Sequence, residues 1–163
     1  MSRKVLMVAL LLPLLVILLG IAKAEWHLAH ARTWAFDITG YDPRDLLRGH
    51  YLQYRLVLHE SEPLEPCRED LGEACCFCLT ATAANAPPKV QRARCERARA
   101  SCEGLLQTRY LKQLERYYIP EQGAQKLEEK LREAAARGQA RVLVAIDAAG
   151  RPQVQTLRLG DGP

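Results

Sequence analysis

The chain has 163 residues, of which 26% are charged and 48% hydrophobic, and its formal net charge is +4. Once an apolar N-terminal segment is set aside, roughly 140 residues remain, which is enough for one domain with its own core. So small a positive charge, without a motif that combines basic and aromatic residues, argues against a nucleic-acid-binding protein.

The N-terminal segment is an unbroken apolar run of about 18 residues, from Val5 to Ala22. At 1.5 Å per residue a helix of this length spans about 27 Å, close to the hydrocarbon thickness of a bilayer. We therefore expect residues 1–24 to form a cytoplasmic tip and a transmembrane anchor, with residues 5–22 in contact with lipid. Arg3 and Lys4 precede the run. They predict that the N-terminus stays in the cytoplasm and that residues 25–163 form an extracytoplasmic domain at the inner membrane, periplasmic in a bacterium.

A cleaved signal peptide is the alternative interpretation of this segment. Ala22-Lys23-Ala24 has the small-x-small pattern of a cleavage site. The apolar run is longer than the usual hydrophobic region of a signal peptide, which favours the retained anchor. Both interpretations send the rest of the chain across a membrane.

Two strands are predicted after the anchor. In the range 33–39, Trp34, Phe36 and Ile38 alternate with Ala35 and Asp37, which is the period of a half-buried strand. The second strand, 51–59, alternates in the same way, with Leu52, Tyr54, Leu56 and Leu58 on one face.

The connection between these strands is unusually rich in charge. Asp42-Pro43 opens a turn, because the Asp side chain can bond nearby backbone and Pro fixes φ. Gly49 permits a positive φ at its exit. Four charged residues lie within it: Asp42, Arg44, Asp45 and Arg48. They either hold the turn by their own ion pairs or form a polar site or docking surface.

The middle of the chain predicts a loop and a second set of strands. Residues 60–72 are acidic and contain two prolines, which indicates a loop. Residues 75–82 are apolar and predict a third strand. Residues 90–98 and 103–107 are predicted to pair as a hairpin around residues 99–102.

The C-terminal third predicts a strand, a helix and a closing hairpin. Residues 115–119 are rich in strand formers, and Pro120 then begins an amphipathic helix with Leu127 and Leu131 on its apolar face. Gly138 suits the position that follows the helix. Residues 141–147 and 154–159 complete the fold. The expected class is α+β and β-rich: a transmembrane helix, then one mainly antiparallel β domain with one packed amphipathic helix near the C-terminus.

The charged connection carries a family resemblance. It resembles the DPRD-x-x-RGDY segment of the GDYXXLXY family of bacterial membrane-anchored proteins. The positions that fit are Asp42, Pro43, Arg44, Asp45, Arg48, Gly49 and Tyr51. The chain departs from the family at three positions: His50 replaces Asp, Tyr54 replaces Leu and Leu56 replaces Tyr.

A second block, residues 115–121, supports the resemblance with Tyr118, Pro120 and Glu121, and the terminal strand–turn–strand is similar as well. The resemblance covers most of the chain, and the cysteine-rich middle is its least family-like part. It implies a membrane anchor, and it carries no known enzymatic activity over to this chain. His50 removes a carboxylate, so the resemblance does not carry over a role that needs that charge.

The six cysteines predict disulfide bonds, because the chain places them outside the cytoplasm. Six cysteines allow 15 complete pairings. The pairing that we favour is Cys95–Cys102, together with Cys67 bonded to Cys75, Cys76 or Cys78.

Metal binding or thiol redox chemistry is the alternative role of the cysteines. Cys75-x-x-Cys78 has the spacing of a redox pair, but it lies in a predicted strand and not at a helix N-terminus. A second Cys-x-x-Cys pair for zinc is missing from the sequence. A fold that brings Cys75, Cys78, Cys95 and Cys102 together would form a copper or zinc site. We nevertheless expect no metal or other cofactor.

A hydrolase is the third interpretation. His50 lies near Asp42 and Asp45, and a His50–Asp45 couple could act as a general base. No serine has the setting of a nucleophile elbow. We therefore expect a non-catalytic accessory or interaction domain that docks another integral membrane protein, with residues 42–51 as its candidate surface.

Overall fold

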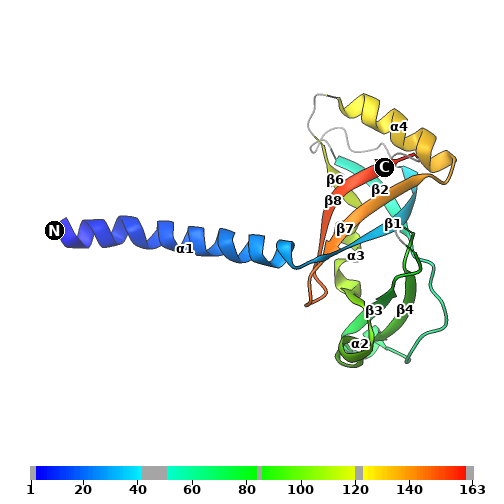
Figure 1. Ribbon diagram of the computed structural model, residues 1–163, viewed down its shortest axis with the longest axis horizontal. Helices are drawn as coiled ribbons and strands as arrows, with labels where there is room; N and C mark the ends of the chain where they lie inside the picture. Colours follow the sequence, from blue (N-terminus) through cyan, green and yellow to red (C-terminus); the bar gives the residue numbers. More distant parts are fainter. Residues whose placement is uncertain (1–2, 42–50, 84–85, 120–122, 161–163) are drawn as a thin grey trace. The chain divides into compact units, whose positions relative to one another are not determined.

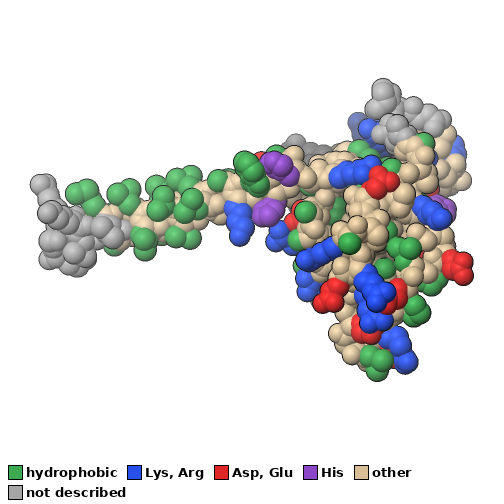
Figure 2. Space-filling model, turned by 60° about the horizontal axis from the view of Figure 1, so that its bottom comes forward, with side chains coloured by type: hydrophobic (Ala, Val, Ile, Leu, Met, Phe, Trp, Pro, Cys, Tyr) green, Lys and Arg blue, Asp and Glu red, His purple; other side chains and the backbone are tan. Residues whose placement is uncertain are grey.

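The computed structural model describes residues 3–41, 51–83, 86–119 and 123–160. The chain divides into two units, Met1–Ala31 and Arg32–Pro163. The first unit is the helix α1 (Arg3–Ala29), which contains Pro13. Its segment Ala9–Ala29 is long and apolar enough to cross a membrane. Hydrophobic side chains cover this helix in Figure 2. Near its end the ring of Trp26 stacks on His30, with centroids 4.4 Å apart.

A five-stranded antiparallel sheet is the centre of the second unit (Figure 1). Its order is β6 (Arg116–Tyr118), β2 (Tyr51–Val57), β1 (Arg32–Tyr41), β7 (Ala140–Ile146) and β8 (Pro152–Leu159). These five strands confirm the predicted ones, four from the alternation of apolar residues and β6 from its strand-forming residues. One face of the sheet carries Phe36, Val142 and Val144, which are buried.

The second sheet has three strands and corrects one prediction. Its order is β4 (Lys89–Arg94), β3 (Cys75–Thr80) and β5 (Gly104–Gln107). The predicted hairpin between residues 90–98 and 103–107 is wrong, because β4 and β5 both pair with β3 and lie on opposite sides of it. Residues Cys95–Ser101 form the helix α2, which returns the chain from β4 to the far edge of β3.

Helices complete the core. The amphipathic helix α4 (Ala124–Ala136) buries Leu131 and Ala134 and contacts β1, β7 and β8, while Lys126, Glu129 and Glu133 are exposed as predicted. Three short segments are also helical: the 3-10 turns Glu69–Leu71 and Thr108–Tyr110, and α3 (Leu111–Leu114). One hydrophobic cluster joins the two sheets, since Phe77 and Leu106 pack with Phe36 and Val142. The fold is α+β and β-rich, as expected.

All six cysteines are bonded, and the pairing differs from our prediction. The bonds are Cys67–Cys75, Cys76–Cys95 and Cys78–Cys102. Cys67 is bonded to one of the three predicted partners. The predicted bond between Cys95 and Cys102 is wrong, because α2 separates these residues and each is bonded to a cysteine of β3 instead. The three bonds fix the loop before η1 (Glu69–Leu71) and both ends of α2 to a single strand.

Candidate functional site

The predicted charged site lies outside the described residues. This holds for Asp42, Pro43, Arg44, Asp45, Arg48, Gly49 and His50, and also for Pro120 and Glu121. Tyr51 is the first residue of β2, and its backbone pairs with that of Tyr118 on β6. The structure therefore brings one described residue of each block, Tyr51 and Tyr118, together on neighbouring strands. The ring of Tyr118 is 75% exposed at this edge of the sheet.

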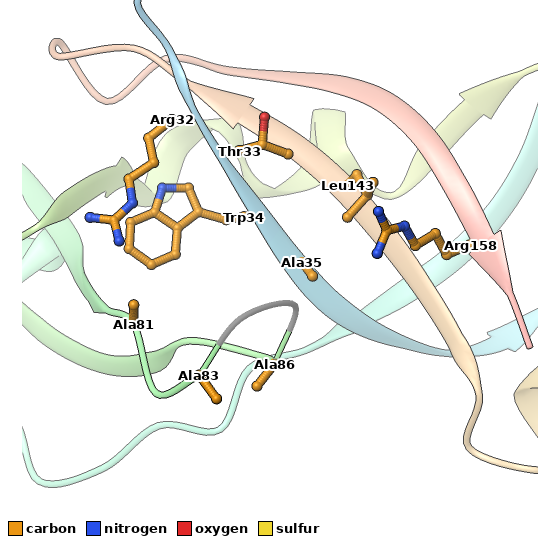
Figure 3. Close-up of a pocket in the computed structure, with 9 residues that line it drawn as sticks. All are labelled: Arg32, Thr33, Trp34, Ala35, Ala81, Ala83, Ala86, Leu143 and Arg158. Atoms are coloured by element: carbon orange, nitrogen blue, oxygen red, sulfur yellow. The ribbon is translucent and has the colours of Figure 1, made fainter. Parts of the chain in front are cut away.

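A groove elsewhere on the second unit is the candidate binding site. Its volume is about 440 Å³, and residues from β1, β7, β8 and the β3–β4 connection line it (Figure 3). The nine lining residues are Arg32, Thr33, Trp34, Ala35, Ala81, Ala83, Ala86, Leu143 and Arg158.

The first wall of the groove is an open edge of β1. Residues 32–36 pair with β7 only, because β2 joins β1 at Asp37 and beyond. Among the residues that the structure describes, no strand pairs with the other edge of this stretch. Four consecutive residues of β1 line the groove. Since alternate side chains point to opposite faces of a strand, consecutive lining means that the strand edge faces the groove.

An aromatic ring lies at one end of the groove. The Trp34 side chain is 4% exposed, and its ring packs so closely on Gly104 that a Cβ there would lie 2.4 Å from the ring. The guanidinium of Arg32 lies 4.6 Å from the ring centroid and donates to Glu103 at 2.8 Å. The indole N–H of Trp34 is buried and has no acceptor in the described part of the chain.

The far end of the groove carries a second cation, Arg158. On β7 its neighbour is Arg141, whose charge is matched by Asp37 at 2.9 Å, and Asp37 also lies 3.3 Å from His59. Arg158 has no acidic partner among the described residues. Figure 3 shows its guanidinium reaching toward Leu143. A positive charge beside an apolar floor can hold an anionic group.

The wall opposite β1 is made of small side chains. Ala81, Ala83 and Ala86 come from the connection after β3, and Figure 3 shows their side chains across the groove from Leu143. Thr33 is the only hydroxyl in the lining, and it donates to Gln155 at 3.2 Å. The lining therefore offers a backbone edge, a ring and cations, which are groups that hold a ligand.

The cysteines do not form the paired thiols that a redox site needs. Cys75 and Cys78 belong to different disulfides, and both side chains are buried. Within the described ranges, no group of three or more His, Cys, Asp and Glu side chains is placed to hold a metal ion. The His50–Asp45 couple lies outside these ranges.

Sequence reasoning missed the groove. Its alanines carry no chemical signature, and Arg158 is one of many arginines in the chain. The only local signal was the Arg32-Thr33-Trp34 sequence, which places a cation and a ring on one strand face. The open edge exists because β2 pairs with β1 only from Asp37 onward. No residue pattern predicted this limit of the pairing.

Comparison with known families decides the assignment. The profile of the GDYXXLXY protein family matches residues 13–157. The chain belongs to the GDYXXLXY family. No curated protein and no solved structure matches it. In this GDYXXLXY protein the match begins inside α1 and ends inside β8, so it includes the cysteine-rich middle. Two of its departures from the family motif, Tyr54 and Leu56, both pack on the core.

Proposed function

We propose that this GDYXXLXY protein is a membrane-anchored, extracytoplasmic interaction domain that binds another integral membrane protein and has no catalytic activity of its own. One observation carries the proposal: an apolar helix of spanning length precedes a domain in which all cysteines are in disulfides. Disulfides form and persist in oxidising compartments, so these two features together favour export with a retained anchor.

Charge at the N-terminus supports the orientation. Arg3 and Lys4 precede the apolar run, and basic residues favour the cytoplasmic side of a membrane. The domain that follows would then lie outside the cytoplasm. The groove supports a binding role, because its backbone edge, ring and cations are recognition groups.

The first test is the intact mass of the protein recovered from carbonate-washed membranes. Thiols are alkylated before reduction in one sample and after reduction in another. We expect residues 1–24 to be retained and all six cysteines to be alkylated only after reduction. A mass that lacks residues 1–24, or cysteines that react before reduction, would contradict the anchored, disulfide-linked domain.

The second test concerns the partner. The protein is extracted in a mild detergent and its complexes are weighed by native mass spectrometry. We expect a second integral membrane protein at constant stoichiometry across several detergent concentrations. A monomer in every detergent that keeps α1 and the domain intact would refute the interaction role.

A further inference from the structure

We propose that the groove binds a small amphiphilic anion, a carboxylate on a short unbranched apolar chain, with the carboxylate group at Arg158. The inference goes beyond the proposed function and does not rest on it. It is carried by a volume of about 440 Å³, which is in the range of small-molecule sites, and by a half-buried arginine beside an apolar floor.

Strand register places this arginine and the floor on one face of the five-stranded sheet. Arg158 is the neighbour on β8 of Arg141, and Leu143 follows two residues further along β7. Leu143 is in turn the neighbour on β7 of Ala35. Residues two apart in a strand share a face, so all of these side chains point to the same side of the sheet. Figure 3 shows the Arg158 guanidinium extending toward Leu143, so the cation lies beside the floor of the groove.

The charge of Arg158 is available to a ligand. Its neighbour Arg141 is matched by Asp37 at 2.9 Å, whereas Arg158 has no acidic partner in the described part of the chain. Neighbouring like charges on a sheet are unfavourable, so an anion beside Arg158 both attracts it and offsets that repulsion. One guanidinium balances one negative charge. A carboxylate therefore fits better than a phosphate monoester, which carries about 1.5–2 charges.

The floor and the opposite wall accept the apolar part of the ligand. Ala35 and Leu143 form the floor, and the three alanines of the β3–β4 connection lie across the groove from Leu143 (Figure 3). None of these side chains forms hydrogen bonds, so a hydrocarbon chain displaces no polar side-chain contact there. Each methylene group that becomes buried should tighten binding about fourfold. The groove should therefore prefer a carboxylate with a chain over acetate.

The test titrates the full chain, in nonionic detergent micelles, with hexanoate. Trp26→Phe leaves Trp34, which lines the groove, as the only tryptophan, so its fluorescence reports occupancy. We expect a saturable change, with binding about fourfold tighter for each methylene added between butanoate and hexanoate. Hexanamide has nearly the same size without the charge and should bind about tenfold more weakly than hexanoate.

The role of the cation is tested with Arg158→Gln in the same background. This change should weaken hexanoate about tenfold and leave hexanamide unchanged. Arg55→Gln is the matched control, because Arg55 is exposed on β2 and does not line the groove. Partition of a ligand into the micelles is the same for every variant, so it cancels in these comparisons.

The role of the floor is tested independently with Leu143→Ala. This change removes apolar surface beneath the chain of the ligand, so it should weaken hexanoate and hexanamide by the same factor, about three- to tenfold. Leu64→Ala is the control, because Leu64 is exposed and does not line the groove. The floor variant keeps the inference testable should Arg158→Gln fail to fold.

Five results would each overturn the inference. They are no saturable change at tens of millimolar hexanoate, acetate binding as tight as hexanoate, hexyl phosphate binding tighter than hexanoate, equal affinity of hexanoate for the parent and for Arg158→Gln, and tighter binding of the peptide acetyl-Val-Asp-Val-amide. The last result would make an acidic protein segment the occupant. Ligand binding is measured on purified protein, so it can fail while the membrane and partner tests succeed, and the reverse.

Discussion

The hydroxyl of Tyr54 is buried without a hydrogen-bond partner among the described residues. The family motif has Leu at this position and Tyr two residues later, where this chain has Leu56. A buried polar group that lacks a partner costs about 1–3 kcal/mol. We therefore expect Tyr54→Phe to leave the free energy of unfolding unchanged or to raise it by about 1 kcal/mol. Denaturant unfolding measures the change, and a loss above 1 kcal/mol would show that the hydroxyl has a partner.

The same variant has a signature in pH. Burial raises the pKa of Tyr54 far above its usual value, and the charges of Tyr117 and Glu115 act in the same direction. In the unfolded chain a tyrosine ionises near pH 10. In the folded state Tyr54 keeps its proton. The contribution of Tyr54 to the stability of the fold is therefore complete below pH 10 and decreases as the pH rises above 10. Between pH 9 and pH 10.5, the free energy of unfolding of wild type should therefore fall relative to that of Tyr54→Phe.

Asp147 stabilises the turn between β7 and β8. Burial alone would raise the pKa of its carboxyl group, but hydrogen bonds from the backbone N–H groups of Arg151 and Ala149 and from the Arg151 guanidinium lower the pKa overall. The donor–acceptor distances are 2.7–2.9 Å. We expect Asp147→Asn to cost about 1–2 kcal/mol at pH 7. Because the lowered pKa stabilises the fold only while the carboxyl is ionised, this cost should shrink below about pH 4.

At the scale of elements, β3 receives all three disulfides. The sequence separations are 8 for Cys67–Cys75 and 24 for Cys78–Cys102. Both double variants keep the Cys76–Cys95 bond, so the loop that Cys78–Cys102 closes runs through that bond and is about as short as the loop that Cys67–Cys75 closes. Chain entropy therefore predicts similar contributions from the two bonds. Cys75 and Cys78 are both buried, so their replacement by alanine removes similar packing. We expect the Cys78→Ala/Cys102→Ala and Cys67→Ala/Cys75→Ala proteins to unfold at similar denaturant concentrations. A difference above about 1 kcal/mol in the free energy of unfolding would show that strain or packing outweighs loop entropy.

The helix α2 shows why one element could not be predicted. Its sequence, Cys-Glu-Arg-Ala-Arg-Ala-Ser, consists largely of helix-forming residues. Seven residues are too few to form a stable helix alone, and no apolar period separates them from a strand. Two bonds to β3, at Cys95 and at Cys102 just after the helix, fix its ends. The bonded partners lie some 20 positions away in the chain. The local sequence pattern therefore does not indicate the helix.

The strands and α4 could be predicted because their signals are local. Trp34, Phe36 and Ile38 recur every second residue, and Leu127 and Leu131 recur at the helical period. The groove could not, because it forms where β1, β8 and the β3–β4 connection meet. Its cation, Arg158, is distinguished only by lacking an acidic partner among the described residues, which is a property of the assembled domain.

At the scale of the whole molecule, α1 is the candidate membrane-spanning helix. Lysines at positions 14 and 18 would each add about 2.5–3.5 kcal/mol to the cost of membrane insertion. We expect Leu14→Lys/Leu18→Lys to move the protein from the carbonate-resistant pellet to the soluble fraction. Leu64→Lys/Leu71→Lys is the matched control, because both leucines are exposed in the second unit. Release of the control, or retention of the α1 variant, would contradict a single spanning helix.

If the domain is exported as proposed, the order of the cysteines along the chain affects how its disulfides form. Only Cys67–Cys75 joins neighbours in chain order, while the loops closed by Cys76–Cys95 and Cys78–Cys102 overlap. A chain oxidised in order of its emergence from a translocation channel would bond Cys76 to Cys78 and Cys95 to Cys102. Two of its three bonds would then be wrong, and thiol–disulfide exchange would have to rearrange them. The yield of correctly bonded protein in a cell should thus follow the supply of a disulfide isomerase more closely than the supply of an oxidant.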